Sequence, residues 1–449
     1  MTRTVSWKAA TGAAVALGLT LATSAQAAVP VSGDPALYWT QVLAGGLSGS
    51  PTVNSRSYAI VSTAIYDAVN ATTGKTHAAF VQGVQTPGGD TRAATAVAAR
   101  NLLVALNPAK TATYDAALAA SLALVPDGAA KSNGMATGAA VATAALAARA
   151  AEGSTATSSY TPTPGVGNWQ PTPPANLPAA VPQWADVTPF FLTAPDQFRP
   201  GGPPDLGSAA YAAAYDEVMA IGSAGSITRT VEQSLAADFW VQAAGVAPWL
   251  QAGLGIAETA GLSSIENARL FALTSTSIAD SIIGVWDAKY EYDFWRPVTG
   301  IRAGDADGNG VTTGDAAWTP YIVTPNHPSY LSGHSGVAAA GATILAYHFG
   351  DAHDFCLTVT TPSASTLNRC WDSFTGAADD AANSRLWGGI HWRFDNDAGL
   401  ALGRQVGAYA LESRAFDAVP EPPAWAMMIA GFGVSLAALR RSRRLSRRA

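Results

Sequence analysis

The chain has 449 residues, of which 13% are charged and 48% are hydrophobic, with a formal net charge of −6 at pH 7. An acidic chain of this kind is not expected to bind nucleic acid or an anionic membrane surface. The length suffices for one large domain or two. Because charged residues are few, a place where they gather among apolar residues needs a physical explanation.

The N-terminus, residues 1–27, has the three parts of a secretory signal peptide. Arg3 and Lys8 precede the apolar run Ala13–Ala22, and Ala25-Gln26-Ala27 is typical of a cleavage site. A membrane anchor is the alternative, but the apolar run is short for a membrane span. We therefore expect export, and processing by a signal peptidase.

The C-terminus, residues 419–449, also has three parts. Pro420-Glu421-Pro422-Pro423 is followed by the apolar run Ala424–Leu439 and by an end that holds six Arg residues. This tail resembles the PEP-CTERM sorting signal of Gram-negative bacteria, which implies cleavage by an exosortase and release to the periplasm, the cell surface or the extracellular matrix. A permanent anchor is the alternative. Contact with the membrane would then be transient and confined to the two termini. Without residues 1–27 and 423–449 the net charge becomes −14.

Between these ends the pattern predicts a mainly α protein. Residues 28–158 form an N-terminal helical region, and residues 159–206 are rich in Pro and Trp, which indicates an ordered, extended segment packed on the helices. Residues 207–417 return to helical periodicity, with no βαβ alternation, and form the predicted catalytic domain. The helical patterns span 54–70, 92–106, 208–221, 228–244, 263–292, 334–349, 375–392 and 396–413. A helical bundle is the expected architecture.

Two smaller features bear on metals and redox state. Cys356 and Cys370 are the only cysteines, and in an exported chain we expect them to form one disulfide. The run Asp305-Ala-Asp307-Gly-Asn309 begins like a calcium loop. Because Ala316 stands where an EF-hand needs Glu, a plain turn is the favoured interpretation.

The first segment that carries chemistry contains Lys289 and Arg296. At 100° per residue their seven-residue spacing places both cations on one face of a helix, which Pro297 then favours ending. Acidic residues stand nearby, so a solvated helix with ion pairs is the alternative.

The second segment is Ser332-Gly333-His334, just before an apolar run. Small polar residues before a helix expose backbone N–H groups at its positive end, which suits an anion. His334 is placed for proton transfer near neutral pH. An ordinary N-cap with an incidental His is the alternative.

The third segment, residues 384–395, reads SRLWGGIHWRFD. His391 and Asp395 are four residues apart, so the carboxylate can fix the tautomer of the imidazole, while Arg385 adds a further cation. The pair Gly388-Gly389 would let the backbone approach a ligand. A core His paired to an Asp is the alternative.

Taken together, the three segments supply three cations, a helix N-terminus and two His, which suits a phosphate-like oxyanion. Their order and spacing resemble the superfamily of type 2 phosphatidic acid phosphatases and vanadium-dependent haloperoxidases, over roughly residues 160–410. The resemblance implies a helical fold with a four-helix core around the site. Leu331 departs from the pattern, which usually has Pro before Ser-Gly-His, and we expect only a small change in loop stiffness.

The resemblance also implies roles. His334 would be the acid–base, His391 would bond vanadium axially or attack phosphorus, and Asp395 would orient His391. The oxyanion would be bound by Lys289, Arg296, Ser332, Gly333 and Arg385. Trp286 and His327 stand where haloperoxidases place residues of a halide or substrate pocket.

The resemblance therefore implies an exported vanadate-dependent haloperoxidase that oxidises bromide, rather than chloride, with hydrogen peroxide. A soluble secreted acid phosphatase that uses a phosphohistidine on the same residues is the main alternative. It would have no cofactor and would take a phosphate ester as its substrate. A non-catalytic matrix protein and a zinc site on His334, His391 and Asp395 are weaker alternatives, since three cations would repel Zn²⁺. The organic substrate is open, and a homodimer is the expected assembly.

Overall fold

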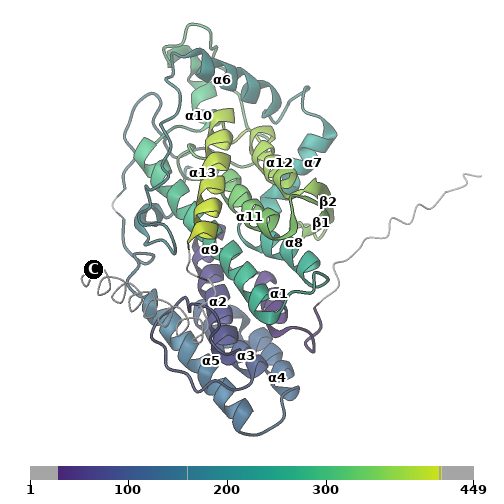
Figure 1. The fold of residues 1–449 in the computed structure, drawn as a ribbon. Helices are drawn as coiled ribbons and strands as arrows, with labels where there is room; N and C mark the ends of the chain where they lie inside the picture. Colours follow the sequence, from purple (N-terminus) through teal and green to yellow (C-terminus); the bar gives the residue numbers. More distant parts are fainter. Residues whose placement is uncertain (1–28, 159, 414–415, 417–449) are drawn as a thin grey trace, which may run out of the picture.

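The computed structural model describes residues 29–158, 160–413 and 416 of the chain (Figure 1). It is mainly helical, as the sequence predicts, and has one two-stranded sheet in its described part. The helices are α1 Pro35–Ala44, α2 Pro51–Thr72, α3 Thr91–Leu106, α4 Thr111–Ala123, α5 Ala129–Ala148, α6 Ala209–Ile221, α7 Val231–Gln242, α8 Ala247–Ala257, α9 Ser264–Tyr292, α10 Pro297–Arg302, α11 Gly333–Phe349, α12 Phe374–Trp387 and α13 Arg393–Glu412. Short 3₁₀ turns are η1 Pro108–Lys110, η2 Pro182–Asp186 and η3 Gly304–Ala306, and the strands are β1 Ala352–Thr360 and β2 Thr366–Ser373.

Helix α9 lies at the centre of the molecule. It begins at a capping box, in which Ser263 and Glu266 satisfy free N–H groups of the first turn, and most of its residues are buried. One side of α9 packs on α2, which belongs to the group α2–α5 at one end of the molecule (Figure 1). The other side packs on α11 and α13, and α12 completes a four-helix core with them.

Helix α13 comes very close to α11 because glycines lie at their contact. A methyl group added at Gly403 would lie 2.3 Å from the carbonyl oxygen of Gly336, and one at Gly399 would lie 2.6 Å from that of Ser332. Only Gly allows this approach. As a result the Ser332 N–H can donate to the Asp395 carbonyl oxygen at 3.0 Å, which joins the second and third chemical segments directly.

The Pro-rich segment is ordered and packs along α9, as expected. The carboxylate of Asp280, fully buried on α9, accepts the backbone N–H groups of Phe190, Phe191 and Leu192 at 2.6, 2.7 and 3.1 Å. Nearer the C-terminal end of α9, the Tyr290 hydroxyl donates to the Ala180 carbonyl oxygen at 2.7 Å. These bonds hold the segment against the helix that carries Lys289.

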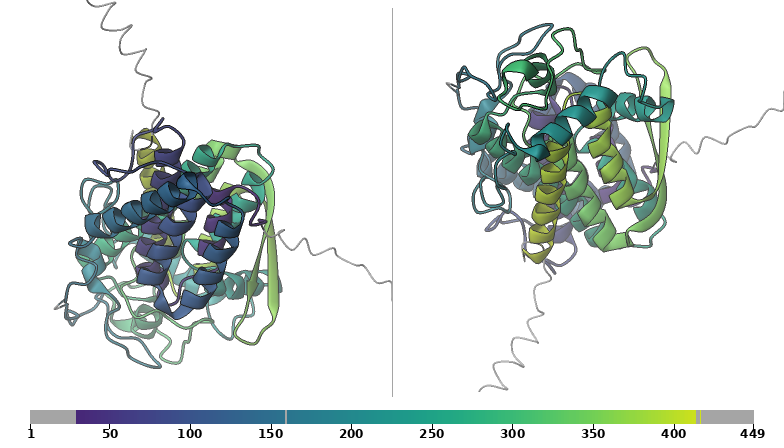
Figure 2. Two further views of the ribbon diagram at one scale, coloured as in Figure 1. Left: turned by 90° about the horizontal axis from the view of Figure 1, so that it is seen from below. Right: turned by 90° about the horizontal axis from the view of Figure 1, so that it is seen from above.

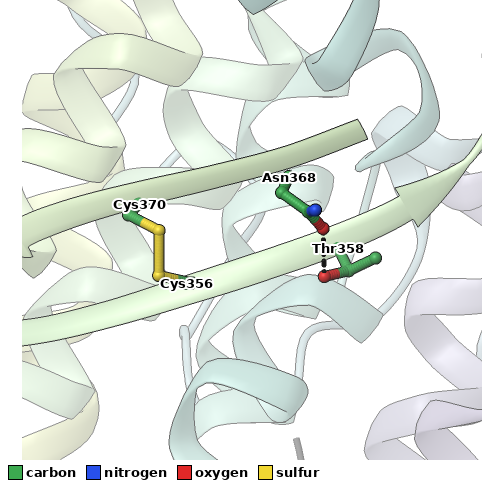
Figure 3. The surroundings of a disulfide bond; sticks show 4 residues. All are labelled: Cys356, Thr358, Asn368 and Cys370. Carbon is green, nitrogen blue, oxygen red and sulfur yellow. Dashed lines mark hydrogen bonds between the residues drawn. A yellow bond between two sulfur atoms is a disulfide. The ribbon is translucent and has the colours of Figure 1, made fainter. Parts of the chain in front are cut away.

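The hairpin of β1 and β2 was not predicted. It lies at one side of the helical body in both views of Figure 2. Cys356 stands opposite Cys370 across the strands and is joined to it by a disulfide, and Thr358 donates to Asn368 nearby (Figure 3). Its strands alternate exposed and partly covered residues, a pattern that is too short and too polar to stand out among helical signals.

The run 305–309 forms a turn. The Asp305 carboxylate accepts the Gly314 N–H at 2.9 Å, and that of Asp307 accepts the Asn309 N–H at 2.8 Å and the Thr312 hydroxyl. No group of three His, Cys, Asp or Glu that could hold a metal ion occurs in the described part of the chain.

The predicted signal peptide, residues 1–27, and the predicted sorting tail, residues 419–449, lie outside the described residues. Within residues 29–158 and 160–413, no helix is long and apolar enough to span a bilayer.

Candidate functional site

Residues of the second and third chemical segments line one cavity of about 270 Å³, and Arg296 of the first segment contacts His327 and His391 in its wall. The cavity lies beside the end of α9, the loop before α11 and the loop between α12 and α13. Its walls include Gly333, His334, Arg385 and His391, together with Trp286 and His327. The predicted site residues are therefore gathered at one place, although they come from segments separated by dozens of residues.

Lys289 lies in the last turn of α9 and is fully buried. Its ammonium group donates to the carbonyl oxygens of Pro328 and Ser329, at 2.8 and 2.9 Å, and to that of Leu331. An ammonium group has three hydrogens, so all of them are used in this structure. Lys289 thus fixes the loop before α11, and its contact with an oxyanion stays a prediction.

Arg296 corrects one prediction, because it is not on the same helix as Lys289. Helix α9 ends at Tyr292, and Arg296 is the N-cap residue of α10. Its guanidinium is nevertheless buried beside the cavity. It donates to the carbonyl oxygens of His327 and Ile390 at 2.8 and 2.7 Å, and to ring nitrogens of His391 and His327 at 3.0 and 2.9 Å.

Arg385 differs from Lys289 and Arg296 in that its buried N–H groups lack acceptors in the described part of the chain. It comes from the last turn of α12, is 4% exposed and lines the cavity. Its Nε and Nη1 are buried and have no hydrogen-bond partner among the described residues. A buried guanidinium with free N–H groups is costly unless an anion accepts them.

The tautomer of His391 is fixed from both sides. Its Nδ1 lies 2.8 Å from a carboxylate oxygen of Asp395, which can only accept, so Nδ1 carries the hydrogen. Its Nε2 lies 3.0 Å from Arg296, which can only donate, so Nε2 holds the lone pair. The same Asp395 oxygen also accepts the Ser329 hydroxyl and the Trp392 N–H.

The position of this pair differs from a simple helical i,i+4 contact. His391 stands before α13, and Asp395 lies in its first turn and reaches back.

The pair Gly388-Gly389 serves another purpose than expected. Gly389 has φ +75°, and a methyl group there would lie 2.2 Å from the Gly222 carbonyl oxygen, so it permits backbone packing rather than approach to a ligand.

His334 is the other imidazole of the cavity, in the first turn of α11. Its Nε2 lies 3.0 Å from the carbonyl oxygen of Trp240, near the C-terminal end of α7. A carbonyl only accepts, so Nε2 carries the hydrogen, and Nδ1 of the neutral ring is left to take or give a proton. Trp240 is held in turn, because its indole N–H donates to Asp380 at 2.8 Å.

Asp380 is shared with the disulfide-bonded hairpin. Arg369 on β2 donates to both oxygens of this carboxylate, at 2.6 and 2.7 Å, and the Trp371 indole donates at 3.2 Å. The hairpin therefore supports the residue whose carbonyl orients His334.

Ser332 and Gly333 begin α11 as expected. The Ser332 hydroxyl caps the helix by accepting from the Ser335 N–H, at a long 3.4 Å, and from the Ser335 hydroxyl at 2.8 Å. Gly333 lines the cavity, and Ser332 is fully buried behind it. The start of this helix therefore borders the same cavity as Arg385, and a helix N-terminus at a cavity suits an anion.

Trp286 and His327 lie together, with their ring centroids 5.0 Å apart, and both line the cavity. The Trp286 indole N–H is buried and has no acceptor among the residues described. The two side chains thus adjoin the basic group and present one unsatisfied donor.

Burial governs the electrostatics of the site. It lowers the pKa values of Arg296 and Arg385 to about 9 and pushes that of Lys289 well below its usual range, and in Lys289 and Arg385 the neighbouring Arg296 adds repulsion. Burial and the nearby cations also lower the pKa of His334 and His391, so both rings are neutral near pH 7. Burial raises the pKa of Asp395, against the opposing effect of the Ser329 hydroxyl.

Several residues of the site escaped the sequence analysis. Ser329 binds Asp395, and it stands three residues before Ser332, where its hydroxyl could have suggested a role. The Trp240 carbonyl left no signal, because a backbone atom is common to all residues.

The residues present fit a tetrahedral oxyanion. Arg385 offers unused N–H groups, His391 holds a lone pair on Nε2, and the start of α11 borders the cavity that both line. The cations exceed the single buried carboxylate, Asp395, so the group lacks negative charge that a ligand would supply. A zinc site is disfavoured by the same positive charge.

Fold and site thus define a helical-bundle protein with a buried group of Lys, Arg and His residues at its cavity. Residues 269–417 match the family described as VCPO second helical-bundle domain. The chain is also similar to the vanadium chloroperoxidase of Curvularia inaequalis, with 25% identity over 175 residues, which cover 30% of this chain and 29% of that protein. The match thus spans well under half of that relative.

Two solved structures extend the similarity to most of the chain. One is described as the first bacterial vanadium-dependent iodoperoxidase, with TM-score 0.70 and 25% identity, covering 86% of this chain and 97% of that one. The other, a holo-type bacterial vanadium-dependent chloroperoxidase, has TM-score 0.66 and 18% identity, covers 80% and 91% of the two chains, and supports the fold alone. Over residues 269–417 the chain is thus similar to a vanadium chloroperoxidase domain, and its whole fold is similar to that of bacterial vanadium haloperoxidases.

Proposed function

We propose that the protein is an exported vanadate-dependent haloperoxidase that oxidises a halide, bromide rather than chloride, with hydrogen peroxide. The observation that carries this proposal is Arg385, a buried cation with N–H groups that lack an acceptor among the described residues, which lines one cavity together with His391 and His334. The relatives support it, since they are described as vanadium chloroperoxidases and an iodoperoxidase.

In this proposal Arg385 and Arg296 would hold vanadate, Lys289 would add its positive charge beside them, and His391 would bind the vanadate through Nε2. Bound vanadate supplies a Lewis acid that activates peroxide toward attack by halide without a change in its own oxidation state. Asp395 keeps the hydrogen of His391 on Nδ1, so that Nε2 stays available. Arg296 now donates to that Nε2, and an oxyanion that accepts the same hydrogen would release the lone pair.

His334 moves the proton. Its Nε2–H is held by the Trp240 carbonyl, so exchange with a ligand in the cavity occurs at Nδ1. Its lowered pKa keeps the ring neutral near pH 7 and ready to accept a proton. A bound oxyanion adds negative charge beside the ring and favours its protonated form.

A secreted acid phosphatase is the second candidate, and one observation favours it. The free lone pair of His391 and the available Nδ1 of His334 equally suit a nucleophile and an acid for phosphoryl transfer. Phosphate and vanadate share their charge and oxygen arrangement, so the basic group holds either.

The experiment uses the purified protein after removal of anions. We would add orthovanadate, then follow bromination of a phenol dye with peroxide and bromide, alongside hydrolysis of a phenyl phosphate. Bromination that depends on vanadate is the expected result. Hydrolysis that vanadate inhibits, without bromination, would establish the phosphatase, and neither activity would refute both proposals.

A further inference from the structure

Val181 lines the cavity in a backbone conformation that is rare for its residue type. Its φ and ψ are 42° and 52°, in the left-handed region, where a β-branched side chain is strained. It lies in the Pro-rich segment, immediately before η2. Strain of this kind persists only where the surroundings enforce it, and it gathers at binding and catalytic sites.

The surroundings of Val181 do enforce it. The preceding residue, Ala180, donates its N–H to the Asn326 carbonyl oxygen at 2.8 Å, and its own carbonyl accepts the Tyr290 hydroxyl at 2.7 Å. Asn326 is itself tied back to the segment, because its side-chain amide donates to the Pro178 carbonyl oxygen at 2.6 Å. The chain is thus fastened on the N-terminal side of Val181 to two elements of the site.

Val181 is one of the apolar residues of the cavity lining, which together form an apolar wall of the cavity that Arg385 also lines. The wall also includes Pro51 at the start of α2, Ala244 after α7, and Ile282 and Val337 on α9 and α11. The titratable residues that line the cavity are Arg385 and three His residues, His327, His334 and His391. The cavity lining therefore combines basic groups with apolar side chains and contains no carboxylate.

The size of the cavity suits one small ring. An apolar cavity of about 150 Å³ is enough to bind benzene. The whole cavity, at about 270 Å³, leaves room for a single ring beside an oxyanion. The indole N–H of Trp286, a residue of the cavity lining, has no acceptor among the described residues and could donate to an oxygen such as that of a hydroxyl group.

We propose that the apolar wall binds a small, uncharged, electron-rich organic molecule with one hydroxyl group, such as a phenol, and that Val181 limits the size it admits. A cation would be repelled by Arg385, and an anion would compete for the basic group. The catalytic part of this inference rests on the proposed haloperoxidase function. Halogenation then takes place on a bound substrate rather than only in solution.

The proposed halogenation needs only hydrogen peroxide, bromide, one proton and the phenol. Peroxide oxidises bromide by two electrons, taking up one proton, and gives hypobromous acid and water. A ring carbon of the phenol then bonds to bromine and loses its hydrogen as a proton, which leaves with the hydroxide of hypobromous acid as a second water. The apolar wall holds the ring beside the place where the electrophile forms.

Binding can be measured without vanadate, peroxide or bromide. We would titrate the full-length protein with 4-ethylphenol and with 2-naphthol by calorimetry. Val181→Phe should weaken 4-ethylphenol binding at least tenfold, whereas Val181→Gly, which fits φ 42° and enlarges the site, should bind 2-naphthol at least fivefold more tightly than wild type does. Val166→Phe is the matched control, because Val166 lies in the same segment, is 52% exposed and does not line the cavity.

The binding result decides the inference by itself. Absence of saturable phenol binding to the wild type, or equal effects of the changes at Val181 and Val166, would overturn it. Because Val181→Gly relieves strain, its melting temperature should not fall, so a failure of the Phe variant to fold still leaves one informative variant.

The products then test the catalytic part. With vanadate, peroxide and bromide, the ortho-to-para ratio of bromophenols should differ from that given by hypobromous acid alone, and Val181→Gly should shift it toward the free-reagent value. Phenol binding without any bromide oxidation would refute the proposed haloperoxidase function but not the binding site. Bromide oxidation with the free-reagent ratio would refute halogenation of the bound substrate.

Discussion

Replacing Arg385 by Met should make the anion-free protein more stable. Burial lowers the pKa of the guanidinium from 12.5 to about 9. At about 1.36 kcal/mol per pKa unit this corresponds to a cost of roughly 5 kcal/mol for keeping the charge. Relaxation around a real buried ion reduces that figure, so we expect a gain of about 2–4 kcal/mol in the free energy of unfolding for Arg385→Met.

The sign of the pH dependence follows from the same shift. A base with a lowered pKa binds fewer protons in the folded than in the unfolded protein between pH 9 and 12.5, so stability rises with pH only in that range. Between pH 5 and 8 the cost is constant. The difference between Arg385→Met and wild type should therefore be the same at pH 5 and at pH 8.

Adding an anion should reverse this order of stability, so that wild type becomes at least as stable as Arg385→Met. Phosphate at about 100 times its dissociation constant stabilises a protein by about 2.7 kcal/mol, and at 1,000 times by about 4.1 kcal/mol. Wild type should gain this amount and Arg385→Met much less. We would measure urea unfolding with and without phosphate, using Arg404→Met as the control, since Arg404 is half-exposed and lies outside the cavity. A variant that is less stable than wild type without anion, or equally stabilised by phosphate, would refute the electrostatic argument.

Three other changes test separate parts of the site. His391→Ala should reduce turnover at least about 100-fold, with the melting temperature in anion-free buffer nearly unchanged; full turnover would mean that the site is assigned wrongly. Asp380→Asn should lower kcat about tenfold, with little change in vanadate affinity, because it loosens Trp240 and so the orientation of His334, and Asp380→Glu should restore part of it. An equal loss in a variant of exposed Asp379 would contradict this. Burial raises the pKa of Asp280 from 3.8 to about 6, so the folded protein binds the extra proton and stability contributed by this group is lost as pH rises from 4 to 6, by about 3 kcal/mol. Unfolding of Asp280→Asn at several pH values should lack this slope, and an unchanged slope would count against the shift.

The sequence predicted the chemical segments because anion chemistry restricts residue type. The small polar residues before an apolar run correctly predicted that α11 begins near Gly333. The spacing of His391 and Asp395 correctly predicted the contact between their side chains. The two side chains make this contact although His391 lies before α13. The reason is that an acidic side chain in the first turn of a helix can contact a residue that precedes the helix.

The sequence failed where tertiary contacts decide the local structure. Counting at helix geometry placed Arg296 on the helix of Lys289, but the chain leaves α9 at Asp293, which has φ 46°. The Pro-rich segment fixes this exit, because the Trp169 N–H donates to the Asp293 carbonyl oxygen and the Trp295 N–H donates to that of Gly167 at 2.8 Å. Those partners lie more than a hundred residues away in the chain, out of reach of any local pattern.

The path of the chain after α9 determines which hydrogen-bond donors of the site remain available to a ligand. Turned away from the helix, the guanidinium of Arg296 satisfies two carbonyl oxygens and two His rings, and Lys289 satisfies three carbonyl oxygens. Arg385 alone keeps its charge without an acceptor. A single halide ion could meet only part of this excess, whereas an oxyanion of higher charge with several oxygens could accept from Arg385 and Arg296 together.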